Sequence, residues 1–188
     1  MFKKLRCFLL ILLVALTGIA NAQGYMYENR EYGVSIVFPD GWAVDKEFQS
    51  KTILAVSRNH EGESINLAVE MLPKQYNNCT FKGFSRKELK DYAIQLERKL
   101  LSINHTIKMD GWDTKLIDGQ TAVWFLLSMP VPTSTAQQEM KILHVQVMHN
   151  AKLYMITCGT TAEKYRNFKP VFSQTVNSLK FSMPGISL

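Results

Sequence analysis

Hydrophobic and polar residues alternate along several short stretches of the chain, and this spacing predicts β-strands. In the stretch Tyr32–Trp42, residues Val34, Ile36 and Phe38 recur at every second position and therefore share one face of an extended strand. The stretch Ser64–Met71 alternates in the same way, which predicts an antiparallel strand with one half-exposed face.

The stretch Thr121–Met129 differs, because it is apolar on both sides of the predicted strand. Val123 and Phe125 point to one side, and Ala122 and Trp124 point to the other. A strand that is buried on both sides needs a layer of structure above and below its sheet. This stretch therefore predicts a layered domain.

Two-residue turns join further strands into hairpins. Asp118-Gly119 and Asn150-Ala151 each separate two apolar stretches. Residues Pro130–Ala136, rich in proline and hydroxyl side chains, predict an exposed connection. The predicted strands around these segments are His105–Ile117 (interrupted at Asp110-Gly111), Thr121–Met129, Glu139–His149 and Lys152–Cys158.

A capping box predicts the first helix. The Ser85 hydroxyl and the Glu88 carboxylate are spaced so that each satisfies a free backbone N–H group at the start of a helix. The helix is expected to end near Ser102. Its apolar stripe consists of Leu89, Tyr92, Ala93, Leu96 and Leu100.

A second capping box, Thr160 to Glu163, predicts the last helical region. Pro170 interrupts the apolar stripe that follows it, and proline cannot donate a backbone hydrogen bond. We therefore expect a short helix, a kink, and a second helix from about Lys169 to Leu179. The pattern predicts two or three helices in all.

The first 22 residues have the composition of a cleavable signal peptide. Basic residues precede the apolar run Cys7–Leu16, and Ala20 and Ala22 supply the small side chains that signal peptidase needs. An apolar run of about ten residues is too short for a membrane span of about 20. We expect cleavage after Ala22, no transmembrane anchor, and one domain of residues 23–188 in the periplasm or the medium.

Charge adds little evidence about partners. Three of the 22 basic residues lie in the signal segment, which leaves 19 basic and 16 acidic residues in the mature chain. The sequence does not concentrate Lys and Arg as a nucleic-acid footprint requires, and export also argues against such a partner. We expect no nucleic acid.

Two cysteines remain in the mature chain, Cys79 and Cys158. In an oxidising compartment an even number suggests a disulfide, here closing a loop of roughly 80 residues and stabilising by about 4 kcal/mol. The alternative is that Cys158 is a small buried apolar residue and Cys79 is free.

No pattern in the sequence predicts a catalytic, cofactor or metal site. His144 and His149 lie an odd number of residues apart, so a strand places them on opposite faces, away from a common metal. Asp110, Asp113 and Asp118 occur near glycines, where aspartate favours turns. Neither a Gly-x-Ser-x-Gly elbow nor a cysteine nucleophile signature is present.

The loop between Pro73 and Phe84 is the candidate partner surface. It combines aromatic and basic side chains, a composition common at interfaces. The alternative is that its aromatic residues pack onto the domain. The candidate residues are Lys74, Tyr76, Phe81, Lys82 and Phe84.

The order of these motifs resembles one known family. Five features follow one another as in the PsbP-like, Mog-type α/β/α sandwich, which includes the bacterial DcrB-type exported proteins. They are the Tyr32–Trp42 start, a middle helix, Asp-Gly-Gln-Thr-Ala at 118–122, Tyr-Met-Ile-Thr-Cys at 154–158 and a closing helix ending Val-Asn-Ser-Leu-Lys-Phe at 176–181. The resemblance implies a single-domain α+β fold with a mainly antiparallel sheet of about six to seven strands.

Members of this family are mostly accessory subunits, binding proteins and adaptors, with no shared catalytic residues. The resemblance therefore implies an exported, non-enzymatic binding or accessory protein whose partner is another envelope or extracellular protein. Two alternatives stay open: a small secreted enzyme of hydrolase type, and a secreted virulence-type factor.

Overall fold

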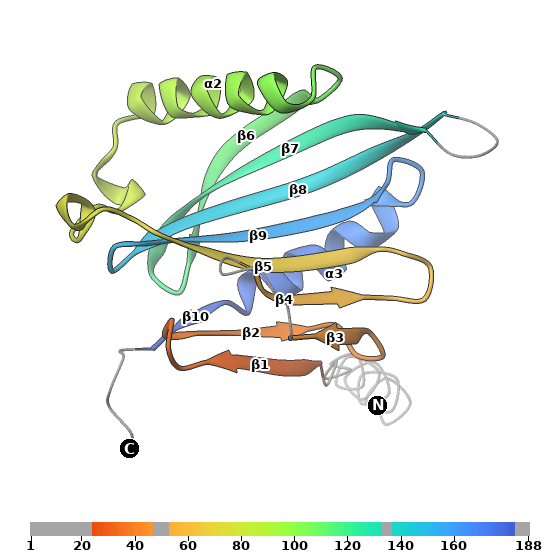
Figure 1. Cartoon of the computed structure of the whole chain (residues 1–188), viewed down its shortest axis with the longest axis horizontal. Helices are drawn as coiled ribbons and strands as arrows, with labels where there is room; N and C mark the ends of the chain where they lie inside the picture. Colours follow the sequence, from red (N-terminus) through yellow and green to blue (C-terminus); the bar gives the residue numbers. More distant parts are fainter. Residues whose placement is uncertain (1–23, 47–52, 133–136, 183–188) are drawn as a thin grey trace, which may run out of the picture.

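The computed structural model describes residues 24–46, 53–132 and 137–182 (Figure 1). The predicted signal peptide lies outside the described residues. The elements in chain order are β1 (Tyr25–Asn29), β2 (Val34–Phe38), β3 (Ala43–Asp45), β4 (Ile53–Arg58), β5 (Ser64–Met71), the 3-10 turns η1 (Lys74–Tyr76) and η2 (Phe81–Gly83), α2 (Arg86–Ile103), β6 (Lys108–Ile117), β7 (Gln120–Pro132), β8 (Gln137–His149), β9 (Lys152–Thr161), α3 (Tyr165–Asn177) and β10 (Lys180–Phe181).

Seven of the described strands form one sheet in the order β3-β4-β5-β9-β8-β7-β6, and every neighbouring pair is antiparallel. The predicted two-residue turns are confirmed. Asp118 and Gly119 have φ values of 49° and 75°, and Asn150 and Ala151 have φ values of 49° and 55°. Two consecutive positive φ values match the twist of the strands that the turn joins.

Two different layers cover the sheet (Figure 1). The helix α2 and the turn η2 pack on one face, which we call the α2 face. The helix α3 and a second sheet of β1, β2 and β10 pack on the other, the α3 face. Val123 and Phe125 of β7 are buried on the α2 face, while Ala122 is buried on the α3 face. The predicted burial of β7 on both sides is confirmed.

The first helix is confirmed in detail. In α2 the Glu88 backbone N–H donates to the Ser85 hydroxyl at 3.3 Å, and the Ser85 N–H donates to the Glu88 carboxylate at 2.7 Å. In the predicted apolar stripe, Leu89 and Ala93 are buried in the core of the α2 face, and the other three residues are partly buried against it. The predicted interruption of β6 is also confirmed, as a register shift between Met109 and Gly111.

The prediction of a second capping box is wrong, because strand β9 continues through its first two residues. Thr160 and Thr161 pair with Lys141 and Met140 of β8, so these residues are still in the sheet. The helix α3 begins afterwards, and its N-cap residue Lys164 makes no side-chain cap hydrogen bond.

The predicted division into two helices is wrong as well, since α3 is a single helix with Pro170 inside it. Arg166, whose carbonyl oxygen loses its helical partner, is exposed, as is Pro170. Water can therefore satisfy the oxygen.

The predicted exposed connection at Pro130–Ala136 is wrong over its first three residues. Residues Pro130 to Pro132 pair with Glu139 to Gln137 and lengthen the hairpin of β7 and β8. Residues 133–136 lie outside the described residues. Among the described helices, none has both the length and the apolar composition needed to cross a membrane.

Candidate functional site

The predicted partner loop is divided between core and surface. Phe81 is only 1% exposed, and its ring lies 5.3 Å from the ring of Tyr92 and 5.8 Å from that of half-buried Phe84. Phe81 and Phe84 therefore close the α2 face, as the alternative interpretation expected. Lys74, Tyr76 and Lys82 are exposed.

The predicted disulfide is not formed, and both cysteines are free. Cys158 is fully buried in the core of the α3 face. Cys79 lies between η1 and η2, in a loop whose Phe81 packs on the α2 face. The sheet thus separates the core around Cys158 from the loop that carries Cys79. Burial raises the pKa of the Cys158 thiol, so this thiol stays protonated.

The two histidines of β8 lie on opposite faces of the sheet, as predicted. The ring of His149 lies 4.8 Å from that of Phe181, which belongs to the second sheet. His144 lies on the α2 face and contacts Thr157 and Gln146. Within the described part of the chain, no three side chains of the metal-binding types come together.

A groove of about 410 Å³ runs along α2, between the helix and the uncovered part of the sheet. Leu96, Leu100 and Ile103 form its helical wall, and Leu153 and Met155 of β9 form part of its floor. The side chain of Ile103 is 75% exposed. The groove is therefore an accessible apolar surface, which is uncommon in a small soluble domain.

Four polar side chains form a hydrogen-bonded chain beside this groove. The Tyr92 hydroxyl donates to the Gln146 amide oxygen, so the amide nitrogen faces His144 and donates to Nε2 at 2.9 Å. Nδ1 of His144 must then carry the proton, which it donates to Thr157 at 2.9 Å. Both ring nitrogens of His144 are occupied.

The pKa shifts of His144 and Tyr92 agree with a structural role for both side chains. Burial lowers the pKa of His144 to about 4, and burial together with the Glu70 carboxylate raises the pKa of Tyr92 to about 12. Both side chains are therefore neutral near pH 7. Neither is poised to transfer a proton, because a general acid or base works best with a pKa near the operating pH.

Positive charge is concentrated on the α2 side of the molecule. The segment 73–108, which contains the loop and α2, has eight basic and three acidic residues, whereas the rest of the chain after residue 22 has 11 basic and 13 acidic residues. The basic residues are Lys74, Lys82, Arg86, Lys87, Lys90, Arg98, Lys99 and Lys108. Arg86 and Lys108 pair with Asp113 and Asp110 of β6, so the other six basic residues carry the excess positive charge of this basic layer.

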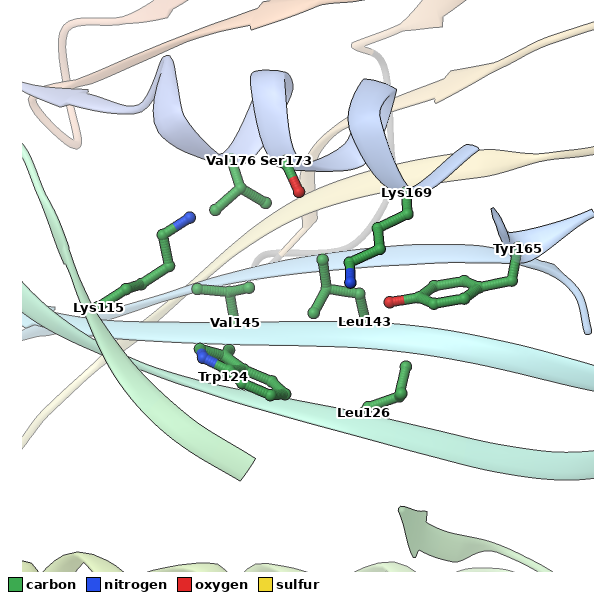
Figure 2. Close-up of a pocket in the computed structure, with 9 residues that line it drawn as sticks. All are labelled: Lys115, Trp124, Leu126, Leu143, Val145, Tyr165, Lys169, Ser173 and Val176. Atoms are coloured by element: carbon green, nitrogen blue, oxygen red, sulfur yellow. The ribbon is translucent and has the colours of Figure 1, made fainter. Parts of the chain in front are cut away.

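A second cavity, of about 200 Å³, opens between α3 and the sheet (Figure 2). Its floor comes from β7 and β8, and two lysines, Lys115 of β6 and Lys169 of α3, extend over it. Burial lowers the pKa of Lys115. The lining residues are Lys115, Trp124, Leu126, Leu143, Val145, Tyr165, Lys169, Ser173 and Val176.

Sequence reasoning missed this cavity, because its lining comes from four elements. One local signal was present. Tyr165, Lys169, Ser173 and Val176 are spaced so that they share one face of a helix, and this face interrupts its apolar residues with a lysine and a serine. A helix face that carries polar groups toward a sheet indicates incomplete packing.

Comparison with known proteins identifies relatives at the level of the fold. The sequence model of the PsbP family matches residues 23–181. The solution structure of cyanobacterial PsbP (CyanoP) from Synechocystis sp. PCC 6803 superimposes with a TM-score of 0.63 at 14% identity, covering 87% of this chain and 95% of that one. A comparison with curated proteins finds no match.

Two other solved structures share the fold. The Ran-binding protein Mog1p of Saccharomyces cerevisiae has a TM-score of 0.55 at 13% identity, covering 84% of this chain and 95% of that one. LpqN of Mycobacterium tuberculosis, described as involved in cell envelope biogenesis, has a TM-score of 0.51 at 8% identity, covering 85% and 86%.

Proposed function

This chain belongs to the PsbP family, and we propose that it is an exported, non-enzymatic accessory protein that binds an acidic surface of another envelope or extracellular protein. The observation that carries this proposal is the basic layer formed by α2 and the preceding loop, which adjoins an open apolar groove. Export rests on the signal-like composition of residues 1–22.

The α2 layer has the two properties that a protein interface combines. The groove offers apolar area, with Ile103 exposed by 75% at the C-terminal end of the helix. Lys90, Arg98 and Lys99 of the same helix are exposed and add positive charge around it. Complementary charge steers a partner and selects its orientation, while the apolar centre supplies affinity.

The relatives support a binding role in general terms. Mog1p, which shares the fold, is a Ran-binding protein, so this architecture is able to present a protein-binding surface. LpqN, which also shares it, is involved in cell envelope biogenesis.

The test compares charge-reversed variants of the full chain. A photo-crosslinking residue in place of Tyr76 captures the neighbour in the envelope and the medium, and the captured protein is then purified for affinity measurement. One variant carries Lys90→Glu, Arg98→Glu and Lys99→Glu. The control carries Arg30→Glu, Arg58→Glu and Arg166→Glu, three exposed basic residues outside the α2 layer.

We expect the α2 variant to lose affinity by about tenfold or more, and the control to change it by less than about twofold. Equal loss in both variants would contradict the α2 surface, and so would capture of nucleic acid in place of protein. Mass spectrometry of the exported protein is expected to find Gln23 at its N-terminus. An intact Met1 would contradict cleavage.

A further inference from the structure

The cavity under α3 has the properties of a small-molecule site, separate from the α2 layer. We propose that it binds a small carboxylate with an apolar body, the carboxylate held between Lys115 and Lys169 and the body lying against Trp124. Figure 2 shows both lysines extending over an apolar floor to which Trp124, Leu143 and Val145 contribute.

The size of the cavity limits the ligand. Its volume of about 200 Å³ is below the range of about 300–1,000 Å³ that drug-sized ligands occupy. An apolar cavity of about 150 Å³ is sufficient to bind benzene. The cavity therefore fits a single aromatic ring or a short alkyl chain together with its carboxylate.

The charge of the cavity selects an anion. The Lys115 ammonium donates to the neutral Asn177 side chain at 2.5 Å. In the described part of the chain, neither Lys115 nor Lys169 has a carboxylate within ion-pair distance. Two ammonium groups beside an apolar cavity thus lack a counter-ion, and a bound carboxylate would supply one.

Two hydroxyl groups of α3 add directional contacts. Figure 2 shows the Tyr165 hydroxyl and the Lys169 ammonium pointing toward each other, and the Ser173 hydroxyl pointing down from the helix. The cavity therefore has a polar side along α3 and an apolar side along β7 and β8. This division suits a ligand with one charged end, because a purely apolar ligand would form no charge-assisted hydrogen bond with the two lysines.

Isothermal titration calorimetry with three probes tests both parts of the proposal. The probes are 3-phenylpropanoate, 3-phenylpropan-1-ol, which lacks the charge, and acetate, which lacks the apolar body. We expect 3-phenylpropanoate to bind at least about tenfold more tightly than either of the others, because only it satisfies both sides of the cavity. In a parallel NMR titration with 3-phenylpropanoate, we expect the indole N–H resonance of Trp124 to shift and that of Trp112, on the α2 face, to stay unchanged.

Variants locate the site. Lys115→Met and Lys169→Met remove a charge but keep a long stem, and each is expected to weaken 3-phenylpropanoate about tenfold with little effect on the alcohol. Lys90→Met, on α2, is the matched control and leaves binding unchanged. Ser173→Leu fills the cavity and abolishes binding of both aromatic probes; Leu126→Phe replaces it if the first variant does not fold.

Three results would overturn the proposal: no binding of 3-phenylpropanoate, equal binding of the acid and the alcohol, or binding that survives both lysine variants. These outcomes are independent of the α2 layer. Failure here leaves the accessory role standing, and loss of partner binding in the α2 variant leaves the cavity intact.

Discussion

The two faces of the large sheet are closed in different ways. Among the described residues, the core cluster on the α3 face contains 19 buried side chains, drawn from the large sheet, α3 and the second sheet, whereas the cluster on the α2 face contains seven. On the α2 face one long helix leaves a groove open beside it. The α3 face therefore contributes more of the buried apolar area, and the α2 face more of the accessible surface.

The α3 face therefore mainly stabilises the fold, whereas the α2 face mainly presents accessible surface. A residue in the core of the α3 face lies between the large sheet and the layer formed by α3 and the second sheet. Its substitution therefore alters the packing of both layers. A residue on the outer side of α2 contacts water, so its substitution changes charge and recognition at little cost in folding. Three measurements distinguish the faces, and they follow from the largest expected effect to the smallest.

The two cysteines report directly on the shielding of each face. With a thiol reagent under native conditions, we expect Cys79 to react readily and Cys158 to react more slowly by at least about a thousandfold, because Cys158 reacts only when the domain opens. Denatured protein that was never reduced is expected to have two reactive thiols. Similar native rates would contradict the difference in shielding, and absent thiols would indicate a disulfide.

The two histidines of β8 give the faces different pH responses. The pKa of His144 is lowered by burial from 6.5 to about 4, so the unfolded chain binds the proton first as the pH falls. The stability is therefore complete above about pH 6.5 and decreases toward pH 4, by up to about 3 kcal/mol. Urea unfolding between about pH 7 and 4.5 measures this loss, above the range where carboxylates dominate.

The variant His144→Gln is expected to remove most of that slope. His149→Gln is the matched control on the α3 face. Burial and the Lys152 charge also lower the pKa of His149, but the nearby Asp118 charge opposes this shift, so its variant is expected to remove less. A slope that is unchanged in His144→Gln would contradict the buried, neutral state of His144.

The two capping-box motifs differ in their expected contribution to stability. Ser85→Ala removes the hydroxyl that accepts from Glu88, and we expect a loss of about 1 kcal/mol in the free energy of unfolding. Glu163→Ala, in the motif that forms no cap, is expected to change it by less than about 0.5 kcal/mol. Denaturant titration measures both, and equal losses would show that the second motif is also used.

These motifs also show how far local sequence patterns reach. The Ser85 motif predicted α2 correctly, because no strand pairs with its backbone in the described part of the chain. The Thr160 motif has the same spacing, yet β8 pairs with Thr160 and Thr161 and continues the strand. The preference of a helix cap is small beside the hydrogen bonds of a growing ladder. A local motif predicted the structure only where no tertiary pairing opposed it.

The disulfide shows a similar limit. An even number of cysteines suggested a pair, but pairing requires two side chains on the same side of the sheet at a short distance. The alternation of β9 turns Cys158 into the core of the α3 face, and the loop with Cys79 closes over the α2 face. The number of cysteines does not show on which side of the sheet each of them lies, because that depends on how the fold arranges the strands and the loops between them.

The sequence by itself determined most of the strands, the two-residue turns, the first helix and the order of motifs that resembles the PsbP family, since these depend on the spacing of neighbouring residues. The short strands β3 and β10 came only from pairing in the fold. Only the tertiary structure showed where the basic layer and the cavity lie. The basic layer appears when α2 and its loop lie on one side of the sheet, and the cavity appears when Lys115 of β6 and Lys169 of α3 meet over β7 and β8. Spacing along the chain predicts which face a side chain takes, whereas packing between distant elements decides what it faces.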